Sequence, residues 1–507
     1  MSSNAVLDVF EKYQKARVQF VQKVSELATR PQNIDALQGA GVMRLLRPLL
    51  LDVVPSIQQS AASALGSLAN HSDDLAEDVV ANEILPQLVY SLGDQNRFYK
   101  KAATYVLRSV AKHSPELAQA VVDSGALFSL TTCLEDFDPG VKESAAWALG
   151  YIASHNQALA HSVVDAGAVP LLVLCIQEPE LSLKRICASA LADICKHTAE
   201  LAQAVVDAGA VPYLAPMVQH EDSKLKRQVC ACLSQIAKHE VDLAEVVVEA
   251  EIFPSILRCL KDNDAIVAKN AATCIREVAK HTPEMAKLIV NAGGAAALVD
   301  YVQKSRGNAR LPAIMALGYI AAFSETLALA IIVSSGVEPL KLSLLQEKDD
   351  HIKAAAAWAI GQVGRHSSDH ARAIAEADVL RLLIHALKDE SSSADLAKKA
   401  KRSLKAIINK CTHYESLENA LREAPAGTQR HILEQFSNLL PNDSQARKSF
   451  VKQGCLQYTL TLDDINPDLK PLVEKISDNF PSEIVNYYSP KYAKGLLDQL
   501  DSHQPAV

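Results

Sequence analysis

Aromatic residues and glycine are both scarce in this sequence. Phe, Trp and Tyr together make up 5% of the 507 residues, and only 19 glycines are present. Apolar residues reach 49% and are dominated by Ala, Leu and Val, which favour helices. An extended β architecture is therefore excluded, and the composition predicts an all-helical chain.

Cysteine motifs and long apolar runs are also missing. The ten cysteines include no CxxC pair, and Cys230 and Cys232 have a spacing that suits neither zinc nor a redox dithiol. We expect reduced core cysteines in an intracellular protein. No apolar run approaches the roughly 18 residues of a membrane span, and no secretion signal opens the chain. These absences predict a soluble protein without a membrane partner.

Positive charge is in deficit, with a formal net charge of −8. Nucleic-acid binders need Lys and Arg to neutralise phosphates, so this balance argues against a nucleic-acid partner. A local basic strip remains compatible with the average.

One phrase returns at a fixed interval, as in VVDSGALFSL around Gly125 and VVDAGAVPLL around Gly167. The step is 42 residues, with a single step of 43, and a period in the low forties is typical of armadillo arrays. The anchors in this register are Gly41, Glu83, Gly125, Gly167, Gly209, Glu251, Gly293, Gly336 and Asp378.

Residues 114–155 illustrate how one repeat folds. Ser114 is a suitable N-cap and Pro115 a suitable first residue for a helix that ends at Gly125, where a left-handed backbone turns the chain. Residues 126–134 form a second helix, and Asp138-Pro139 starts a third. The apolar residues predicted for its core are Val141, Ala145, Ala148, Leu149 and Ile152. Such a repeat cannot bury its apolar surface alone, so the repeats must stack.

The expected fold is an all-α, right-handed armadillo-repeat solenoid of three-helix units with helical caps at both ends. We predict an N-terminal capping helix within residues 1–31, nine repeats of about 42 residues across 32–411, and a degenerate repeat with a helical C-terminal cap across 412–507. Within the last segment, the phrase around Gly454 resembles one more first-helix ending.

A ladder of histidines also follows the register: His71, His113, His155, His197, His239, His281 and His366. Equivalent positions in stacked repeats lie about 10 Å apart, too far for one zinc ion. Each histidine closes a third helix, where its side chain can satisfy the last carbonyls. We therefore interpret the ladder as structural and expect no metal.

No catalytic set or cofactor motif is visible. The sequence lacks a phosphate-binding Gly-rich loop, HExxH and GxSxG. The sequence therefore predicts neither an enzyme nor a cofactor.

Cations recur where the third helices begin. Such cations oppose the helix dipole, so local stability does not explain them and a partner would. The alternative is that they are solvated and that acidic neighbours such as Glu143 cancel their field. The members of this basic track are Lys100, Lys101, Lys142, Lys184, Arg185, Lys226, Arg227, Lys269, Arg310 and Lys353.

Large side chains one turn apart occur in the same helices. They either anchor an extended peptide in a groove or fill the space between repeats. These candidate groove residues are Trp147, Tyr151, Tyr319, Trp358 and Gln362.

Residues 32–411 resemble the armadillo family, and AAWALGYIA at 145–153 is close to its third-helix phrase. In that family the third helices line the concave face. Nuclear-import receptors pair tryptophan with asparagine four residues later, but this chain has Tyr151 and Gln362 at those positions, so an import receptor is a poor match.

A closer resemblance covers nearly the whole chain, including FEKYQKARVQFVQKVSELATRPQNI and EIVNYYSP outside the repeats. These segments resemble the sperm-associated antigen armadillo proteins of the flagellar axoneme. The resemblance implies a scaffold of the central-pair apparatus in cilia and flagella, bound to a central microtubule and needed for its stability and for motility.

The implied partners are tubulin and other central-apparatus proteins. Self-association into a periodic array is a further hypothesis. The alternative is a soluble adaptor that binds linear peptide motifs in cargo or signalling proteins.

Overall fold

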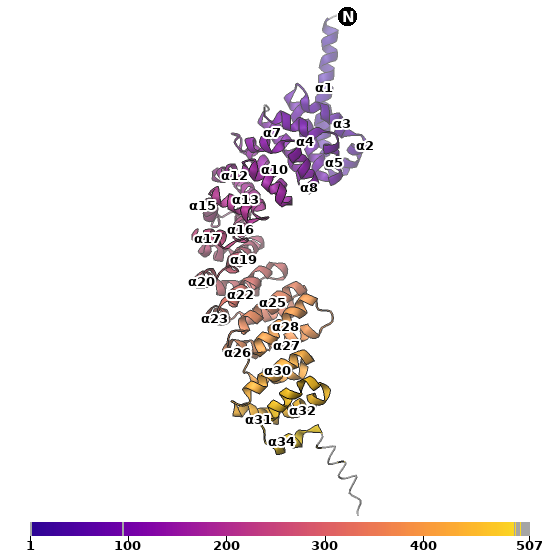
Figure 1. The fold of residues 1–507 in the computed structure, drawn as a ribbon. Helices are drawn as coiled ribbons and strands as arrows, with labels where there is room; N and C mark the ends of the chain where they lie inside the picture. The colour runs from indigo at the N-terminus through magenta and orange to yellow at the C-terminus, as the bar shows by residue number, and fades with distance from the viewer. Residues whose placement is uncertain (1–2, 94–95, 491, 493–496, 498–507) are drawn as a thin grey trace, which may run out of the picture. The chain divides into compact units, whose positions relative to one another are not determined.

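The computed structural model describes residues 3–93, 96–490, 492 and 497, and every regular element among them is a helix (Figure 1). The chain forms two compact units, Met1–Val278 (unit 1) and Ala279–Val507 (unit 2). The all-helical repeat architecture is confirmed, whereas the count of nine repeats stays a prediction. The final segment expected across 412–507 falls partly outside the described residues.

Unit 1 starts with one long helix, after which helices recur in threes. Its elements are α1 (Ser3–Ala28), η1 (Pro31–Asn33), α2 (Ile34–Gly39), α3 (Val42–Leu46), η2 (Arg47–Leu51), α4 (Pro55–His71), α5 (Asp73–Ala81), α6 (Ile84–Leu92), α7 (Arg97–Ala111), α8 (Pro115–Asp123), α9 (Ala126–Cys133), α10 (Pro139–His155), α11 (Gln157–Asp165), α12 (Ala168–Gln177), α13 (Leu181–Cys195), α14 (Ala199–Asp207), α15 (Ala210–Met217), α16 (Ser223–Ala237), α17 (Val241–Glu249), α18 (Phe253–Cys259) and α19 (Ala265–Ala279).

Unit 2 continues the three-helix pattern and ends in shorter helices. Its elements are α20 (Pro283–Asn291), α21 (Gly294–Lys304), η3 (Gly307–Ala309), α22 (Leu311–Phe323), α23 (Glu325–Val333), α24 (Val337–Gln346), α25 (Asp350–Gly364), α26 (Ser368–Glu376), α27 (Val379–Lys388), α28 (Ala394–Ile408), α29 (Tyr414–Glu423), α30 (Ala426–Leu439), α31 (Ser444–Lys452), α32 (Cys455–Ile465), η4 (Pro467–Leu469), α33 (Lys470–Ser477) and α34 (Ser482–Tyr488).

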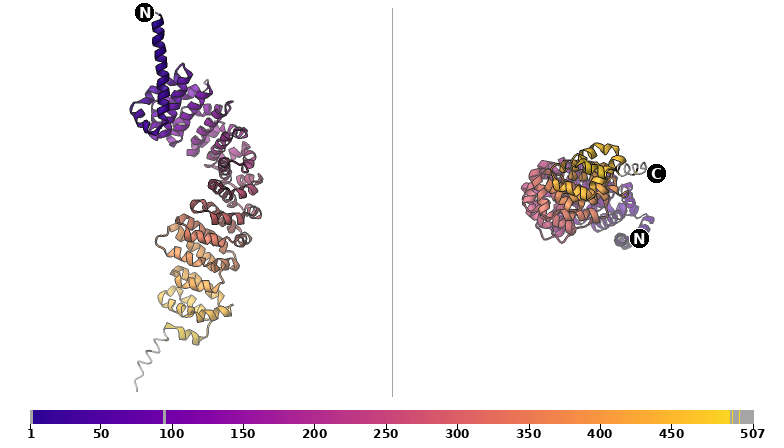
Figure 2. Two further views of the ribbon diagram at one scale, coloured as in Figure 1. Left: turned by 180° about the vertical axis from the view of Figure 1, so that it is seen from behind. Right: turned by 90° about the horizontal axis from the view of Figure 1, so that it is seen from below.

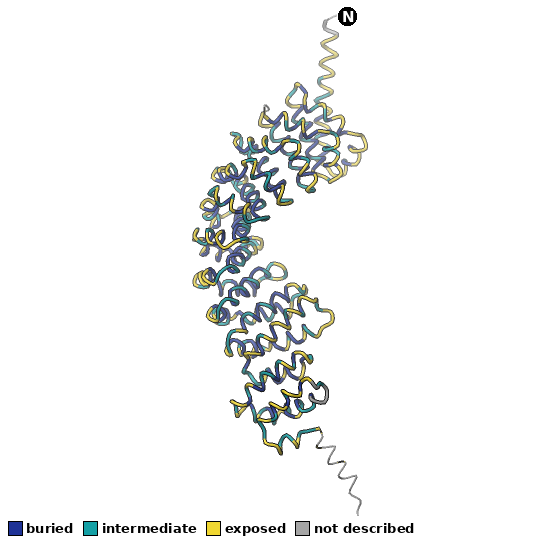
Figure 3. The backbone as a smooth tube through the Cα atoms, in the orientation of Figure 1, coloured by how far each residue is buried: buried dark blue, intermediate teal, exposed yellow. Residues whose placement is uncertain are grey.

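The repeat at residues 114–155 folds as its sequence predicts. The Ser114 hydroxyl accepts the backbone N–H of Leu117 at 3.2 Å, which caps α8, and Pro139 opens α10. The predicted core residues of α10 are all fully buried. In unit 1, α7 packs between α4 and α10, and α13 packs between α10 and α16, so the third helices form the centre of the stack (Figure 3).

The left-handed turns follow the predicted register with one correction. Gly125, Gly167 and Gly209 have φ between 77° and 81°, and even Glu83 and Glu251 have φ of 52°. Gly336 is not such a turn, because its φ is −73° and the left-handed residue is Ser335, at +60°. The turn therefore keeps the 42-residue step, and the extra residue lies after it. Gly454, at +77°, confirms the predicted additional helix ending.

Helix α1 covers the first repeat with only part of its length. Val21, Val24 and Ala28 are buried, and α1 packs on α4. Phe10 and Tyr13 are exposed, because the N-terminal half of α1 extends beyond the repeats (Figure 2).

The histidine ladder joins neighbouring repeats, which differs from the capping role expected. For five of these histidines, the imidazole Nε2 donates to a carbonyl oxygen in the last turn of the third helix of the preceding repeat, not of its own. The bonds are His113 to Ala69 (2.7 Å), His155 to Ala111 (2.6 Å), His197 to Ala153 (2.8 Å), His239 to Cys195 (2.7 Å) and His366 to Ala321 (2.6 Å). A free helix-end carbonyl is thereby satisfied across these five repeat boundaries.

The burial of these imidazoles makes stability depend on pH. Burial, the largest effect, lowers the pKa of His197 and of His366. The unfolded chain binds protons before the folded chain does, so this stabilisation is complete above about pH 6.5 and is lost as the pH falls through the native pKa. We expect His197→Gln to lower the free energy of unfolding by about 1 kcal/mol at pH 7.5 and by less at pH 5.

Urea unfolding followed by circular dichroism at both pH values measures this effect. The matched control is His71→Gln, since His71 occupies the same repeat position but is exposed. Equal losses for His197→Gln at both pH values would contradict the coupling.

The ten cysteines are buried thiols without disulfides, as predicted. Within the described residues no single helix is both long and apolar enough to cross a membrane. Three sharply bent helix pairs, α11–α12, α20–α21 and α23–α24, meet the criteria jointly, by length and composition only.

Candidate protein-binding surface

Three lysines of the basic track are held by loop carboxylates of the next repeat. Each carboxylate stands 36 residues after its lysine, just beyond the second helix of that repeat. The pairs are Lys100–Asp136 (2.8 Å), Lys142–Glu178 (2.7 Å) and Lys226–Asp262. Each of these ammonium groups is partly buried and bridges two adjacent repeats.

A second series engages the residues that cap the third helices. The pairs are Lys101–Asp138 (2.8 Å), Arg185–Asp222 (2.5 Å) and Arg227–Asp264. Asp138 also accepts the backbone N–H groups of Gly140 and Val141, as an N-cap does. The hydrogen bond from Lys101 holds the pKa of Asp138 below its ordinary value, and Arg185 and Arg227 do the same for their aspartates.

This arrangement gives the basic track a structural cause that the sequence did not reveal. Each cation opposes its own helix dipole slightly, but it neutralises a carboxylate of the next repeat, and in the second series that carboxylate caps the start of a third helix. The cancelling acids are these loop and cap residues of the next repeat, and Glu143 is not among the ion-pair partners of the described residues.

Other members of the track lie in different surroundings. Lys353 is 3.5 Å from Asp350 of its own helix. Lys184 is half-buried and Lys269 is exposed, and neither forms an ion pair with another described residue. These two lysines are the members whose ammonium groups are open to a partner.

Arg310 is not a surface residue, which corrects its expected place in the groove. Its side chain is 1% exposed, and it lies 3.0 Å from Glu347 and 3.0 Å from the Ser343 hydroxyl. It also donates to the carbonyl oxygen of Ser305. Arg310 thus joins the residues on either side of η3 to Ser343 and Glu347 of the next repeat's second helix and loop.

An aromatic cluster with one arginine lies on the third helices of unit 1. Trp147 and Tyr151 of α10 stack with their ring centroids 5.3 Å apart. Arg108 of α7 places its guanidinium 5.6 Å from the Trp147 ring centroid and 5.0 Å from that of Tyr105. All four side chains are half-buried, so they contact the repeats and still present a surface. We call these four residues the Arg108 cluster.

Arg108 and Tyr105 were missed as candidate site residues. Their signal was available in part, because Arg108 shares its repeat position with small residues such as Gly66 and Gly150. A Cβ added to Gly66 would lie 2.5 Å from the Tyr105 ring, so a missing side chain in one repeat makes room for a ring of the next. Sequence spacing within one helix does not show this relation.

In unit 2, Tyr319 and Trp358 meet edge to face with ring centroids 5.1 Å apart. Trp358 also covers Gly318, where an added Cβ would lie 2.2 Å from its ring. Gln362 is half-buried one turn further along α25. Trp358 thus fits both predicted roles: it fills space between repeats, and part of its side chain stays at the surface, where it could contact a peptide.

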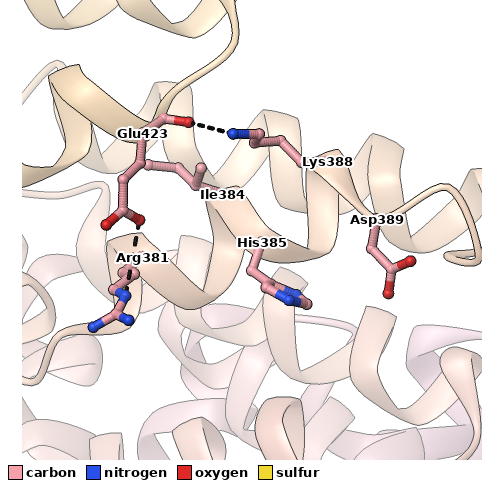
Figure 4. A pocket seen from close by; sticks show the side chains of 6 residues that line it. All are labelled: Arg381, Ile384, His385, Lys388, Asp389 and Glu423. Carbon is pink, nitrogen blue, oxygen red and sulfur yellow. Dashed lines mark hydrogen bonds and ion pairs between the residues drawn. The ribbon is translucent and has the colours of Figure 1, made fainter.

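A pocket of about 540 Å³ lies elsewhere in unit 2, between α27 and the end of α29 (Figure 4). Lys388 donates to the carbonyl oxygen of Glu423 at 3.1 Å, and Arg381 lies 3.8 Å from the Glu423 carboxylate. Both cations are therefore engaged with the chain itself rather than open to an anion.

Comparison with known proteins agrees with this architecture. The family model of the armadillo/beta-catenin-like repeat matches residues 30–70, 114–154 and 198–238. The chain is 66% identical over 506 residues to sperm-associated antigen 6 of Mus musculus, covering 100% of both chains. It is also 66% identical to sperm-associated antigen 6 of Homo sapiens, covering 100% of this chain and 99% of the human one.

Among solved structures, the crystal structure of an engineered protein from the Northeast Structural Genomics Consortium matches with a TM-score of 0.72 and 28% identity. The match covers 77% of this chain and 94% of the engineered one. The armadillo solenoid expected from the sequence is thereby confirmed as the fold class.

Proposed function

Because the chain belongs to the armadillo-repeat family of sperm-associated antigen 6, we propose that it is a structural scaffold of the flagellar axoneme. In this role it binds a central-pair microtubule and neighbouring projection proteins, and it supports central-pair stability and motility. The armadillo repeat is a non-enzymatic fold, and the chain is a protein-interaction scaffold rather than an enzyme.

The observation that carries the proposal is identity of 66% from end to end. The likeness includes α1 and the region of α34, which repeat stacking alone does not require. The relatives' name associates them with sperm, so a place in the flagellum follows for this chain.

We propose the Arg108 cluster as the surface that meets an acidic partner such as tubulin. Most cations of the basic track are already paired, so the attraction they offer to a partner is small. Arg108 differs, because it faces aromatic rings and forms no ion pair with a described residue. An arginine among aromatic side chains is a common centre of binding energy at protein interfaces.

Electron tomography of axonemes from a flagellated cell tests the location. We expect tagged protein to remain after detergent extraction, with density on one central-pair microtubule that disappears on knockdown. A detergent-soluble pool would overturn the scaffold proposal and favour the soluble adaptor that binds linear peptides.

Co-sedimentation with purified microtubules tests the surface. We expect Arg108→Ala combined with Trp147→Ala to weaken binding at least about tenfold, because the double change removes both the cation and the ring beneath it. The control is Lys224→Ala, which removes an exposed cation that lies outside both the cluster and the basic track. Unchanged binding of a double variant that keeps its helical circular dichroism would exclude the cluster as the contact.

A further inference from the structure

In three pairs of buried thiols in unit 1, one thiol shifts the pKa of the other. Cys175 interacts with Cys187, Cys195 with Cys232, and Cys230 with Cys259. Burial raises the pKa of Cys274 to about 12. The pKa of Cys259 is lowered instead, first because the Cys230 thiol donates a hydrogen bond to its sulfur and then because of the charge on Lys226.

Cys259 also lines an open pocket, which most buried thiols cannot offer to a reagent. The pocket has a volume of about 220 Å³ and is lined by Val218, Gln219, Lys226, Ser255, Arg258, Cys259 and Asp262. Two cations, Lys226 and Arg258, therefore share a cavity with one sulfur. A small reagent can enter from solvent, and cations beside a thiol favour the reactive thiolate.

The remaining groups around Cys259 decide how strongly its thiolate is favoured over its thiol. Asp262 opposes the thiolate but is paired with Lys226. The Cys259 thiol donates to the carbonyl oxygen of Val218 at 3.6 Å, a bond that the thiolate gives up. Cys230 retains its own proton and continues to donate to Cys259, because its pKa is raised.

We propose that Cys259 is an oxidation site for hydrogen peroxide and other small hydroperoxides, and that Cys230 resolves the product into a disulfide between α18 and α16. In the first step the Cys259 thiolate attacks one peroxide oxygen. An S–O bond forms, the O–O bond breaks, and the leaving oxygen takes a proton and departs as water from hydrogen peroxide or as an alcohol from an organic hydroperoxide. The sulfur is oxidised to a sulfenic acid by two electrons, and the peroxide is reduced.

In the second step Cys230 loses its proton and attacks the sulfenic sulfur. The S–S bond forms, the S–O bond breaks, and the hydroxide leaves with that proton as water. Two thiols and one hydrogen peroxide thus give one disulfide and two waters. The disulfide would fasten the end of a second helix to the third helix of the preceding repeat.

The chain contains a matched comparison two repeats earlier. Cys175 stands 84 residues before Cys259, and its sulfur likewise donates to a backbone carbonyl, that of Leu134, at 3.6 Å. Lys142 lies beside it, as Lys226 lies beside Cys259. The position of Arg258 is occupied there by Leu174. Arg258→Leu therefore gives this site the apolar residue of the earlier repeat, while the neighbouring thiol remains Cys230 here and Cys187 there.

The first experiment is brief labelling of the intact protein with iodoacetamide at pH 7.5, followed by mass spectrometry. We expect Cys259 to react at least about tenfold faster than Cys274, because each unit of pKa changes the thiolate fraction tenfold. Labelling through global unfolding would modify the two at equal rates, which would overturn the proposal. Arg258→Leu should slow Cys259 towards the rate of Cys175.

The second experiment treats the protein with hydrogen peroxide. Trypsin isolates Cys259 in a three-residue peptide, and Cys230 shares its peptide with Cys232. We therefore expect an unreduced cross-linked peptide whose fragments place the bond on Cys230. In Cys230→Ala, Cys259 should instead accumulate as a sulfenic acid that dimedone traps. A cross-link to Cys232 or Cys274, or sulfinic Cys259 in the unaltered protein, would overturn the role of Cys230.

Discussion

Replacing Glu347 with alanine is expected to destabilise unit 2 by about 3–5 kcal/mol, because the change leaves the buried guanidinium of Arg310 without its counter-charge. Arg310 is 1% exposed, and the Glu347 side chain is 9% exposed. The same carboxylate accepts the backbone N–H of Gly307 at 3.2 Å, so the backbone of η3 also loses its partner. Replacing Glu347 therefore removes an ion pair and a backbone hydrogen bond together.

The measurement is urea unfolding, with hydrogen exchange used to assign the loss to amides of unit 2. The control is Glu338→Ala on α24, whose ion pair with Lys341 is solvent-exposed and about 0–1 kcal/mol in strength. A loss for Glu347→Ala no larger than that of the control would show that Arg310 gains its stability from Ser305 and Ser343 instead.

The fold was largely predictable because its signals are local and repeated. A left-handed residue ends each first helix, and the register located Glu83, Glu251 and Asp378 there although none of them is glycine. Gly336 shows the limit of this reasoning. Glycine is favoured at such a turn but not required. The sequence therefore placed the turn one residue too late, at Gly336 instead of Ser335.

The candidate site was less predictable because its contacts join residues of different repeats. The sequence showed that Lys142 recurs at a helix start, but the partner of Lys142 is Glu178 in the next repeat. The histidine ladder followed the same rule, since the carbonyl bound by His155 belongs to the preceding repeat. Periodicity reports positions within a repeat, whereas the distance between repeats depends on how they stack.

Small residues set that stacking distance, and this leads to the second large effect. We expect Gly361→Leu to destabilise unit 2 by about 3 kcal/mol, since it overpacks the contact between α25 and α28. A Cβ at Gly361 would lie 2.2 Å from the Ser403 hydroxyl oxygen and 3.0 Å from the Ser403 Cα. Ser403 cannot turn aside freely, because its hydroxyl donates to the carbonyl oxygen of Ala357 at 2.7 Å. The helices themselves must therefore separate.

Replacing Gly361 by alanine distinguishes this packing effect from helix propensity, because the two effects change stability in opposite directions. Alanine in place of a helical glycine ordinarily stabilises by about 0.5–1 kcal/mol. Gly427→Ala on α30, where nothing lies within 4 Å of the added Cβ, should show that gain. Gly361→Ala should instead lose stability, because the displaced Ser403 hydroxyl gives up its bond to Ala357. Urea midpoints that rise for both alanine variants would mean that α25 and α28 separate at little cost, and that the glycine is not what sets their spacing.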